Sequence, residues 1–210
     1  MRIRLDILTF VLLIVGAFLL SSCNMVDNRK NVLPVKVNSY ATIGTSFVVR
    51  HYKEKYVITN AHVCRSIMKV NNSTNIQIGL RIEKILYASV PHDLCLVTYS
   101  GAEDGFLVDY SDQLKPDDKL TAIGYPRGKG KITMDGKYRE RFPNFMDRKA
   151  SIISMFMWCI GGCSGSPVLN KHNRVVGVIY AIDTTDLMDT LVIPSEHIME
   201  LIHNYKLGIR

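Results

Sequence analysis

The sequence lacks internal repeats, low-complexity tracts and any recognisable module in which Lys/Arg clusters alternate with aromatic residues. No nucleic-acid partner is therefore expected, and the net charge of +7 is interpreted as a solvated basic surface. Charged residues make up only 21% of the chain and hydrophobic residues 47%, which argues against disorder. The 210 residues suffice for one large or two small domains with buried cores.

The N-terminal segment lacks the length of a membrane span. Its apolar run, residues 7–20, covers about 14 residues and follows Arg2 and Arg4, which is typical of a signal peptide. The run ends in Leu20-Ser21-Ser22-Cys23, which resembles the lipobox of bacterial lipoproteins. In that family the cysteine is diacylated and becomes the mature N-terminus, and two acyl chains suffice for a stable anchor.

We therefore expect residues 1–22 to be a lipoprotein-type signal peptide, Cys23 to be the lipidation site, and residues 23–37 to be a polar tether without periodicity. A plain secretory signal cut near Ser22 and an uncleaved anchor are the alternatives. The expected location is extracytoplasmic. If lipidated, the protein would be a membrane-anchored lipoprotein of the periplasm or cell envelope. If not lipidated, it would be secreted.

The chain also lacks the H-E-x-x-H spacing that places two histidines of one helix on one metal ion. His197, Glu200 and His203 follow one another at steps of three in the expected terminal helix, and we interpret them as a solvated face. Neither a metal nor another cofactor is expected.

Short β-rich runs separated by turns begin at Ser39, and such a pattern predicts an all-β barrel or sandwich. A basic, glycine-containing segment over residues 128–149 is expected to be a hairpin or loop. A final helix is expected over residues 195–205, with the Ser195 hydroxyl accepting from first-turn amides as its N-cap.

The stretch Gly162-Cys163-Ser164-Gly165-Ser166-Pro167 places a nucleophilic residue between glycines. Glycines permit a sharp turn and close approach of a substrate, because they carry no Cβ. Such a turn leaves the N–H groups of Gly162 and Ser164 directed at one spot. Two converging donors are what the oxyanion of acyl transfer requires. An ordinary Gly/Ser turn is the alternative.

Two upstream stretches strengthen the first interpretation. Thr59-Asn60-Ala61-His62-Val63 presents a histidine after a strand, and His92-Asp93-Leu94-Cys95-Leu96-Val97 presents an aspartate before an apolar run. A serine hydroxyl needs a base, and imidazole needs a carboxylate to fix its tautomer. The order His, Asp, Ser, spaced by about 30 and about 70 residues, is that of chymotrypsin and differs from subtilisin and α/β-hydrolases.

These three blocks resemble the signatures of trypsin-like serine peptidases, most closely the bacterial HtrA (Deg) and glutamyl-endopeptidase branches. The resemblance covers roughly residues 40–203. It implies an all-β fold of two six-stranded antiparallel β-barrels of the chymotrypsin type with a C-terminal helix. The expected barrels span residues 38–110 and 111–210.

Carried over by motif, the resemblance makes His62 the general base, Asp93 its orienting carboxylate and Ser164 the nucleophile. The implied activity is that of a serine endopeptidase acting through an acyl-enzyme on protein or peptide substrates. A catalytically silent barrel that binds peptides in the cell envelope is the alternative. A surface lipoprotein with coincidental motifs is a third interpretation, which three ordered blocks disfavour.

The resemblance also implies that Trp158 and Tyr180, Ala181 and Ile182 line the primary substrate pocket. None of them carries a charge that suits Lys or Arg side chains. We therefore expect a preference for small or medium apolar residues.

The remaining cysteines leave alternatives open. Cys64 and Cys95 each lie two residues after a triad candidate, and either a disulfide or two buried thiols fits them. Cys159 and Cys163 bracket the approach to the nucleophile, but a short loop does not always meet disulfide geometry.

Cys163 is also a rival nucleophile, since viral 3C-like relatives carry cysteine in this turn. The register favours serine, because Pro167 lies three residues after Ser164 and a glycine follows Ser164 directly.

Overall fold

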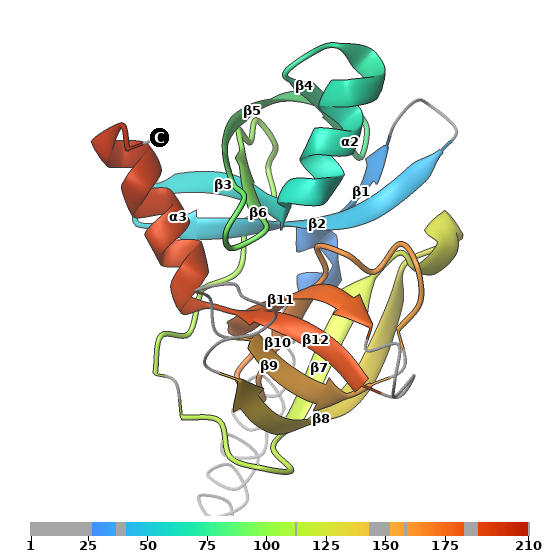
Figure 1. Ribbon diagram of the computed structural model, residues 1–210, viewed down its shortest axis with the longest axis vertical. Helices are drawn as coiled ribbons and strands as arrows, with labels where there is room; N and C mark the ends of the chain where they lie inside the picture. The colour runs from blue at the N-terminus through green and yellow to red at the C-terminus, as the bar shows by residue number, and fades with distance from the viewer. Residues whose placement is uncertain are drawn as a thin grey trace, which may run out of the picture.

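The computed structural model contains two six-stranded antiparallel barrels and a C-terminal helix (Figure 1). It describes residues 27–36, 41–111, 113–142, 152–157, 159–182 and 189–209. The expected fold is confirmed, because each set of six strands closes on itself. The expected signal peptide, Cys23 and Trp158 lie outside the described residues.

The N-terminal barrel has the strand order β1-β2-β3-β6-β5-β4 and closes through pairing of β1 with β4. Its strands are β1 (Val32–Lys36), β2 (Thr42–His51), β3 (Glu54–Asn60), β4 (Asn75–Ile78), β5 (Arg81–Ser89) and β6 (Leu94–Val97).

The C-terminal barrel repeats this order as β7-β8-β9-β12-β11-β10 and closes through pairing of β10 with β7. Its strands are β7 (Lys119–Gly124), β8 (Ile132–Phe142), β9 (Ile152–Phe156), β10 (Pro167–Leu169), β11 (Val175–Ile182) and β12 (Asp189–Pro194). The basic segment expected as a hairpin or loop contributes β8, which pairs with β7 and β9.

Helical segments are few in the described part of the chain: η1 (Asn28–Asn31), α2 (Ala61–Asn71), η2 (Pro126–Gly128) and α3 (Glu196–Leu207). Helix α3 leaves the C-terminal barrel after β12 and lies along the N-terminal barrel (Figure 1). Among the described residues, no helix is long and apolar enough to cross a membrane.

The alternation of side chains along the strands builds three apolar cores. In β2, Val48 packs inside the N-terminal barrel, whereas Phe47 and Val49 join a core shared by both barrels and α3. In β6, Cys95 faces inward while Leu94 packs in the shared core. The C-terminal barrel has an interior of its own. Strands buried on both faces are continuously apolar, which is why the sequence shows short apolar runs rather than strict alternation.

The expected tether over residues 23–37 was wrong at its C-terminal end. Val32–Lys36 forms β1, which pairs with β2 over its whole length and with β4 at Val35 and Lys36. The segment is short and contains Pro34, so its own sequence carries little strand periodicity. Pairing with neighbouring strands decides its structure.

Two helical details also differ from expectation. Helix α2 was not predicted, although Val63, Cys64 and Ile67 form a buried face at helical spacing. Ser195 takes the N-cap position of α3, but its side chain accepts no first-turn amide. Its hydroxyl instead donates to the carbonyl oxygen of Asp109 at 2.5 Å.

Both open disulfide questions are answered in the structure. One disulfide joins Cys64 of α2 to Cys95 of β6, and a second joins Cys159 to Cys163. The first connects two elements of the N-terminal barrel, and the second closes a loop of the C-terminal barrel directly before Ser164.

Candidate active site

His62 and Asp93 lie in direct contact. His62 Nδ1 and Asp93 Oδ2 are 2.6 Å apart, and the other carboxylate oxygen, Oδ1, accepts the backbone N–H of His62 at 2.9 Å. The Asp93 side chain is 2% exposed, whereas the His62 side chain is 40% exposed. In the neutral imidazole, a buried carboxylate beside Nδ1 selects the tautomer that carries the proton there, and Nε2 is then a hydrogen-bond acceptor.

The start of α2 explains this pairing. The helix begins at Ala61, directly after β3, and its first backbone N–H groups have no partner within the helix. Asp93 supplies partners, because its backbone carbonyl accepts from Ala61 N at 3.0 Å and its carboxylate accepts from His62 N. The carboxylate lies at the positive end of the helix, and the Arg65 guanidinium is 3.9 Å from its Oδ1. The same contacts thus cap the helix and orient the histidine.

Ser164 lies in a turn that requires glycine on both sides. Gly162 has a φ of +97° and Gly165 a φ of +86°, in the region that residues with a Cβ rarely adopt. A Cβ at Gly162 would lie 2.5 Å from the Tyr125 carbonyl oxygen, and one at Gly165 would overlap the carbonyl oxygen of Thr45. The glycines therefore allow close approach of protein backbone, not only of a substrate.

The two predicted oxyanion donors, the N–H groups of Gly162 and Ser164, belong to peptide groups whose carbonyl oxygens already accept a backbone hydrogen bond. The Gly161 carbonyl accepts from Arg127 N at 2.6 Å, and the Cys163 carbonyl accepts from Ser166 N at 2.9 Å. In a planar trans peptide the N–H points away from the C=O. Gly162 N–H and Ser164 N–H donate to no other residue in the described ranges, so both donors are available to a ligand.

Sequence reasoning missed Thr45, a fully buried residue of β2 that holds this turn from the other barrel. Its backbone N–H donates to the Ser164 carbonyl at 2.9 Å, and its hydroxyl donates to the Gly162 carbonyl at 2.9 Å. The same hydroxyl accepts from Tyr125 N at 3.0 Å. Residues more than 100 positions apart meet here, and no local pattern in the sequence marks the contact.

The Ser164 hydroxyl is hydrogen-bonded to a carbonyl oxygen and not to the His62 ring. It donates to the Tyr180 carbonyl at 3.5 Å, and among the described residues it makes no hydrogen bond to His62. A bond of this length is weak. The Tyr180 ring meets the His62 ring edge-on with centroids 6.4 Å apart. Tyr180 therefore lies beside both candidate residues, at a point where the pairing register of β11 with β12 shifts between Ile179 and Ala181.

The expected pocket residues are placed only in part. Tyr180 and Ala181 are half-buried near the end of β11, and Ile182 is the last residue of that strand. The pocket assignment stays a prediction.

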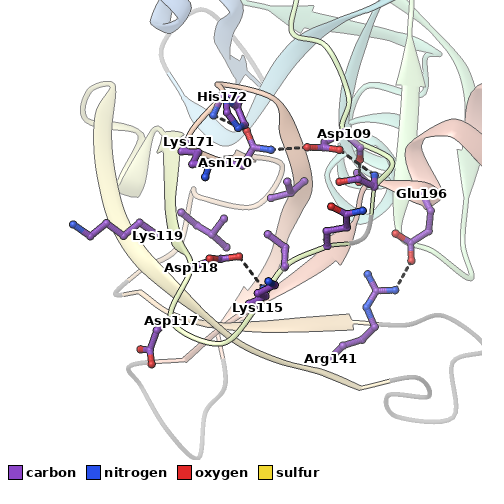
Figure 2. Close-up of a pocket in the computed structure, with 16 residues that line it drawn as sticks. Asp109, Lys115, Asp117, Asp118, Lys119, Arg141, Asn170, Lys171, His172 and Glu196 are labelled. Atoms are coloured by element: carbon purple, nitrogen blue, oxygen red, sulfur yellow. Dashed lines mark hydrogen bonds and ion pairs between the residues drawn. The ribbon is translucent and has the colours of Figure 1, made fainter.

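A cavity of about 630 Å³ lies elsewhere, between the approach to β7, the β10–β11 turn and the start of α3 (Figure 2). Around it Asn170 donates to Asp109 at 2.6 Å, and Arg141 pairs with Glu196 at 2.9 Å. No triad candidate lines this cavity, so it is separate from the site at Ser164.

Comparison with solved structures agrees with the fold. A serine-to-alanine mutant of Rv3671c from M. tuberculosis H37Rv, in its inactive form, matches with a TM-score of 0.68 at 18% identity, covering 86% of this chain and 88% of that one. The HtrA-type protease AlgW with tripeptide matches with a TM-score of 0.70 at 19% identity, covering 83% of this chain and 59% of that one.

The serine endoprotease from Yersinia pestis matches with a TM-score of 0.65 at 18% identity. The match covers 83% of this chain and 62% of that one. The structural neighbours thus include HtrA-type serine proteases, and at these identities the likeness shows the fold.

A family model decides the relationship. The model described as "Trypsin-like peptidase domain" matches residues 44–178, which include His62, Asp93 and Ser164. The match spans well over half of the chain, and both barrels contribute to it. This chain belongs to the trypsin-like peptidase family.

Proposed function

We propose that this chain is a serine endopeptidase that uses His62, Asp93 and Ser164 as its triad. The observation that carries the proposal is the buried Asp93 carboxylate, 2.6 Å from His62 Nδ1, in a chain whose fold and family are those of serine peptidases. The pairing leaves His62 Nε2 as the base, and Tyr180 contacts both His62, through its ring, and Ser164, through its carbonyl oxygen.

Catalysis then begins with rotation of the Ser164 hydroxyl. Its bond to the Tyr180 carbonyl is long, so little is lost when Oγ turns toward Nε2. Hydrogen bonds in unliganded sites often tighten only when substrate is bound. His62 takes the hydroxyl proton as Oγ attacks the peptide carbonyl, and Asp93 stabilises the imidazolium without itself taking the proton.

The tetrahedral oxyanion is received by the N–H groups of Gly162 and Ser164. Their peptides are held by the Arg127 and Ser166 amides, so the donors need no reorganisation during the reaction. His62 next protonates the leaving amine, which departs and leaves the acyl group on Oγ. Water activated by His62 hydrolyses this ester and restores the free serine.

The substrate class is a protein or peptide. AlgW, one of the HtrA-type structures with the same fold, was solved with a decapeptide and with a tripeptide. The half-buried Tyr180 and Ala181 supply no charge for a basic side chain, and this favours small or medium apolar residues at the cleaved bond. A peptide library with cleavage concentrated after Lys or Arg would contradict this preference.

We also propose that the protein is anchored in the cell envelope through a diacylated Cys23. The support is the lipobox-like sequence before this residue. Metabolic labelling with palmitate tests it: the full chain is expected to incorporate label, and the Cys23→Ser variant to lose it. Equal labelling of both forms would contradict the anchor.

One observation favours a second candidate, a silent barrel that binds peptides. The Ser164 hydroxyl is engaged by Tyr180 and not by His62. If this arrangement persists with substrate bound, the serine is not activated, and the turn offers only hydrogen bonds to a peptide.

Fluorophosphonate labelling separates the two candidates. The purified full chain in mild detergent is treated with the probe and the adduct is mapped by mass spectrometry, beside Ser164→Ala and Ser166→Ala variants. An activated nucleophile predicts an adduct at Ser164 that Ser164→Ala abolishes. Ser166→Ala is expected to keep it, because Ser166 is fully buried and leaves Ser164 in place. A folded wild-type chain that takes no label would support the silent barrel.

A further inference from the structure

A cluster of two histidines and a carboxylate lies beside the triad but takes no part in it. His92 comes from the turn between β5 and β6, and His197 and Glu200 come from the first turns of α3. Their ligand atoms all lie within 4.8 Å of one another. Sequence reasoning considered only the α3 residues and expected a solvated face, because the third member, His92, lies over 100 residues away.

The distances fit three ligands of one metal ion, although the contact between His197 and Glu200 is also a hydrogen bond. Glu200 Oε2 lies 3.3 Å from His197 Nδ1 and 3.6 Å from His92 Nδ1. A separation of about 3.6 Å is too long for a hydrogen bond. Two atoms that each lie about 2.1 Å from one tetrahedral zinc ion are separated by roughly 3.4 Å. The carboxylate oxygen therefore stands at ligand spacing from both imidazoles.

Burial and chemistry also suit an ion. The His92 and His197 side chains are 15% and 12% exposed, and their ring centroids lie 4.2 Å apart. Glu200 is 49% exposed, so the site is open to solvent on one side, where a water can complete the coordination. Two imidazoles, one carboxylate and one open position form a donor set that zinc accepts.

We propose that His92, His197 and Glu200 bind one Zn²⁺ ion. The ion would fasten α3, which follows the C-terminal barrel, to the turn of the N-terminal barrel that carries Asp93 (Figure 1). His92 directly precedes Asp93, so the ion would also steady the backbone beside the His62 partner. The binding site itself does not rest on the proposed peptidase activity.

Isothermal titration of the EDTA-treated full chain with ZnCl₂ tests the site. The wild-type chain and Ser164→Ala are each expected to bind one Zn²⁺ per chain, and zinc is expected to raise the melting temperature of both. Co²⁺ in place of zinc is expected to give the visible absorption of a four-coordinate site. Zinc binding by Ser164→Ala would support the metal site whether or not the chain is an active peptidase.

Matched variants locate the ion. His92→Ala and the milder Glu200→Gln are each expected to weaken zinc binding by at least about 10-fold, since even outer partners of a metal ligand contribute 10–100-fold. His203→Ala, an exposed histidine of the same helix, is expected to bind like the wild type. Unfolding in EDTA checks that each variant folds. Binding unchanged in both ligand variants, binding lost only in His62→Ala, or no binding at all would each overturn the proposal.

Discussion

The two barrels hold their parts of the candidate site in different ways. His62 and Asp93 are joined within the N-terminal barrel by direct contacts between neighbouring elements, and the disulfide between Cys64 and Cys95 adds a covalent link beside them. The turn that carries Ser164 belongs to the C-terminal barrel, yet Thr45 of the N-terminal barrel holds it. One half of the site therefore depends on the folding of one barrel, and the other half depends on docking of the two.

Breaking the pair within the N-terminal barrel is expected to have the largest effect on activity. Asp93→Asn keeps the size of the side chain but presents an amide where the carboxylate selects the His62 tautomer. A loss of about 10⁴-fold in kcat is expected, as for the loss of this carboxylate in triads generally. Steady-state kinetics on a peptide substrate measure it, with circular dichroism as the check on folding. A loss smaller than tenfold would remove Asp93 from the triad.

Distorting the turn in the C-terminal barrel is expected to have the next largest effect. Gly162→Ala puts a Cβ against the Tyr125 carbonyl at a φ of +97°, so the peptide that carries one oxyanion donor must shift. Loss of one donor lowers kcat by about 10²–10³-fold. Gly130→Ala is the control, because a Cβ there meets nothing within 4 Å and it lies outside the turn. Equal activity of the two variants would contradict the assignment of Gly162.

Local sequence was enough to predict some of these features and not others. The strand-rich pattern, the glycine turn and the three motif blocks are short stretches that carry their own signal. The pattern alone predicts an all-β barrel or sandwich, and the resemblance of the blocks to trypsin-like peptidases implies the two barrels that the structure has. The pairing of His62 with Asp93 was expected and is present, although their catalytic roles stay predictions.

The remaining features depend on partners far away in the chain. Strand β1 was taken for tether because its short, Pro-containing sequence is ordered by β2 and β4. In the sequence, Thr45 is an ordinary strand residue. It holds the turn of Ser164 only because the two barrels bring its hydroxyl to the Gly162 carbonyl. In the sequence, His92 is notable only as the neighbour of the triad candidate Asp93. Its contact with Glu200 exists because α3 packs beside it in the fold.

The two disulfides are expected to stabilise the two barrels to different extents. The N-terminal bridge closes a sequence separation of 31 residues and the C-terminal one a separation of 4. Because the loss of unfolded-chain entropy grows with loop length, the double variant Cys64→Ala/Cys95→Ala is expected to lose roughly 4 kcal/mol of unfolding free energy. Cys159→Ala/Cys163→Ala is expected to lose roughly 2 kcal/mol. Urea unfolding of the oxidised proteins measures both, and the reverse order would contradict the account.

The smallest expected effect on activity comes from the contact between the barrels. Thr45→Val keeps the shape of the side chain but leaves the Gly162 carbonyl and the Tyr125 amide without the hydroxyl that both now contact. We expect a loss of about 1–3 kcal/mol in unfolding free energy, because buried polar groups become unpaired. Since Gly162 carries one of the two proposed oxyanion donors, a fall of about 10-fold in kcat with little change in KM is also expected.

Ser46→Ala is the matched control for Thr45→Val. Ser46 is the next residue of β2, is equally buried, and donates its hydroxyl hydrogen bond to the Leu33 carbonyl within the N-terminal barrel at 3.0 Å. Both variants are expected to lose stability, but only Thr45→Val is expected to lose kcat, and Thr45→Ser is expected to restore it. If Ser46→Ala lowered kcat as much, general loosening of β2 would explain the effect. The turn that carries Ser164 would then not depend on Thr45 of the N-terminal barrel. The proposed difference between the two halves of the site would be contradicted.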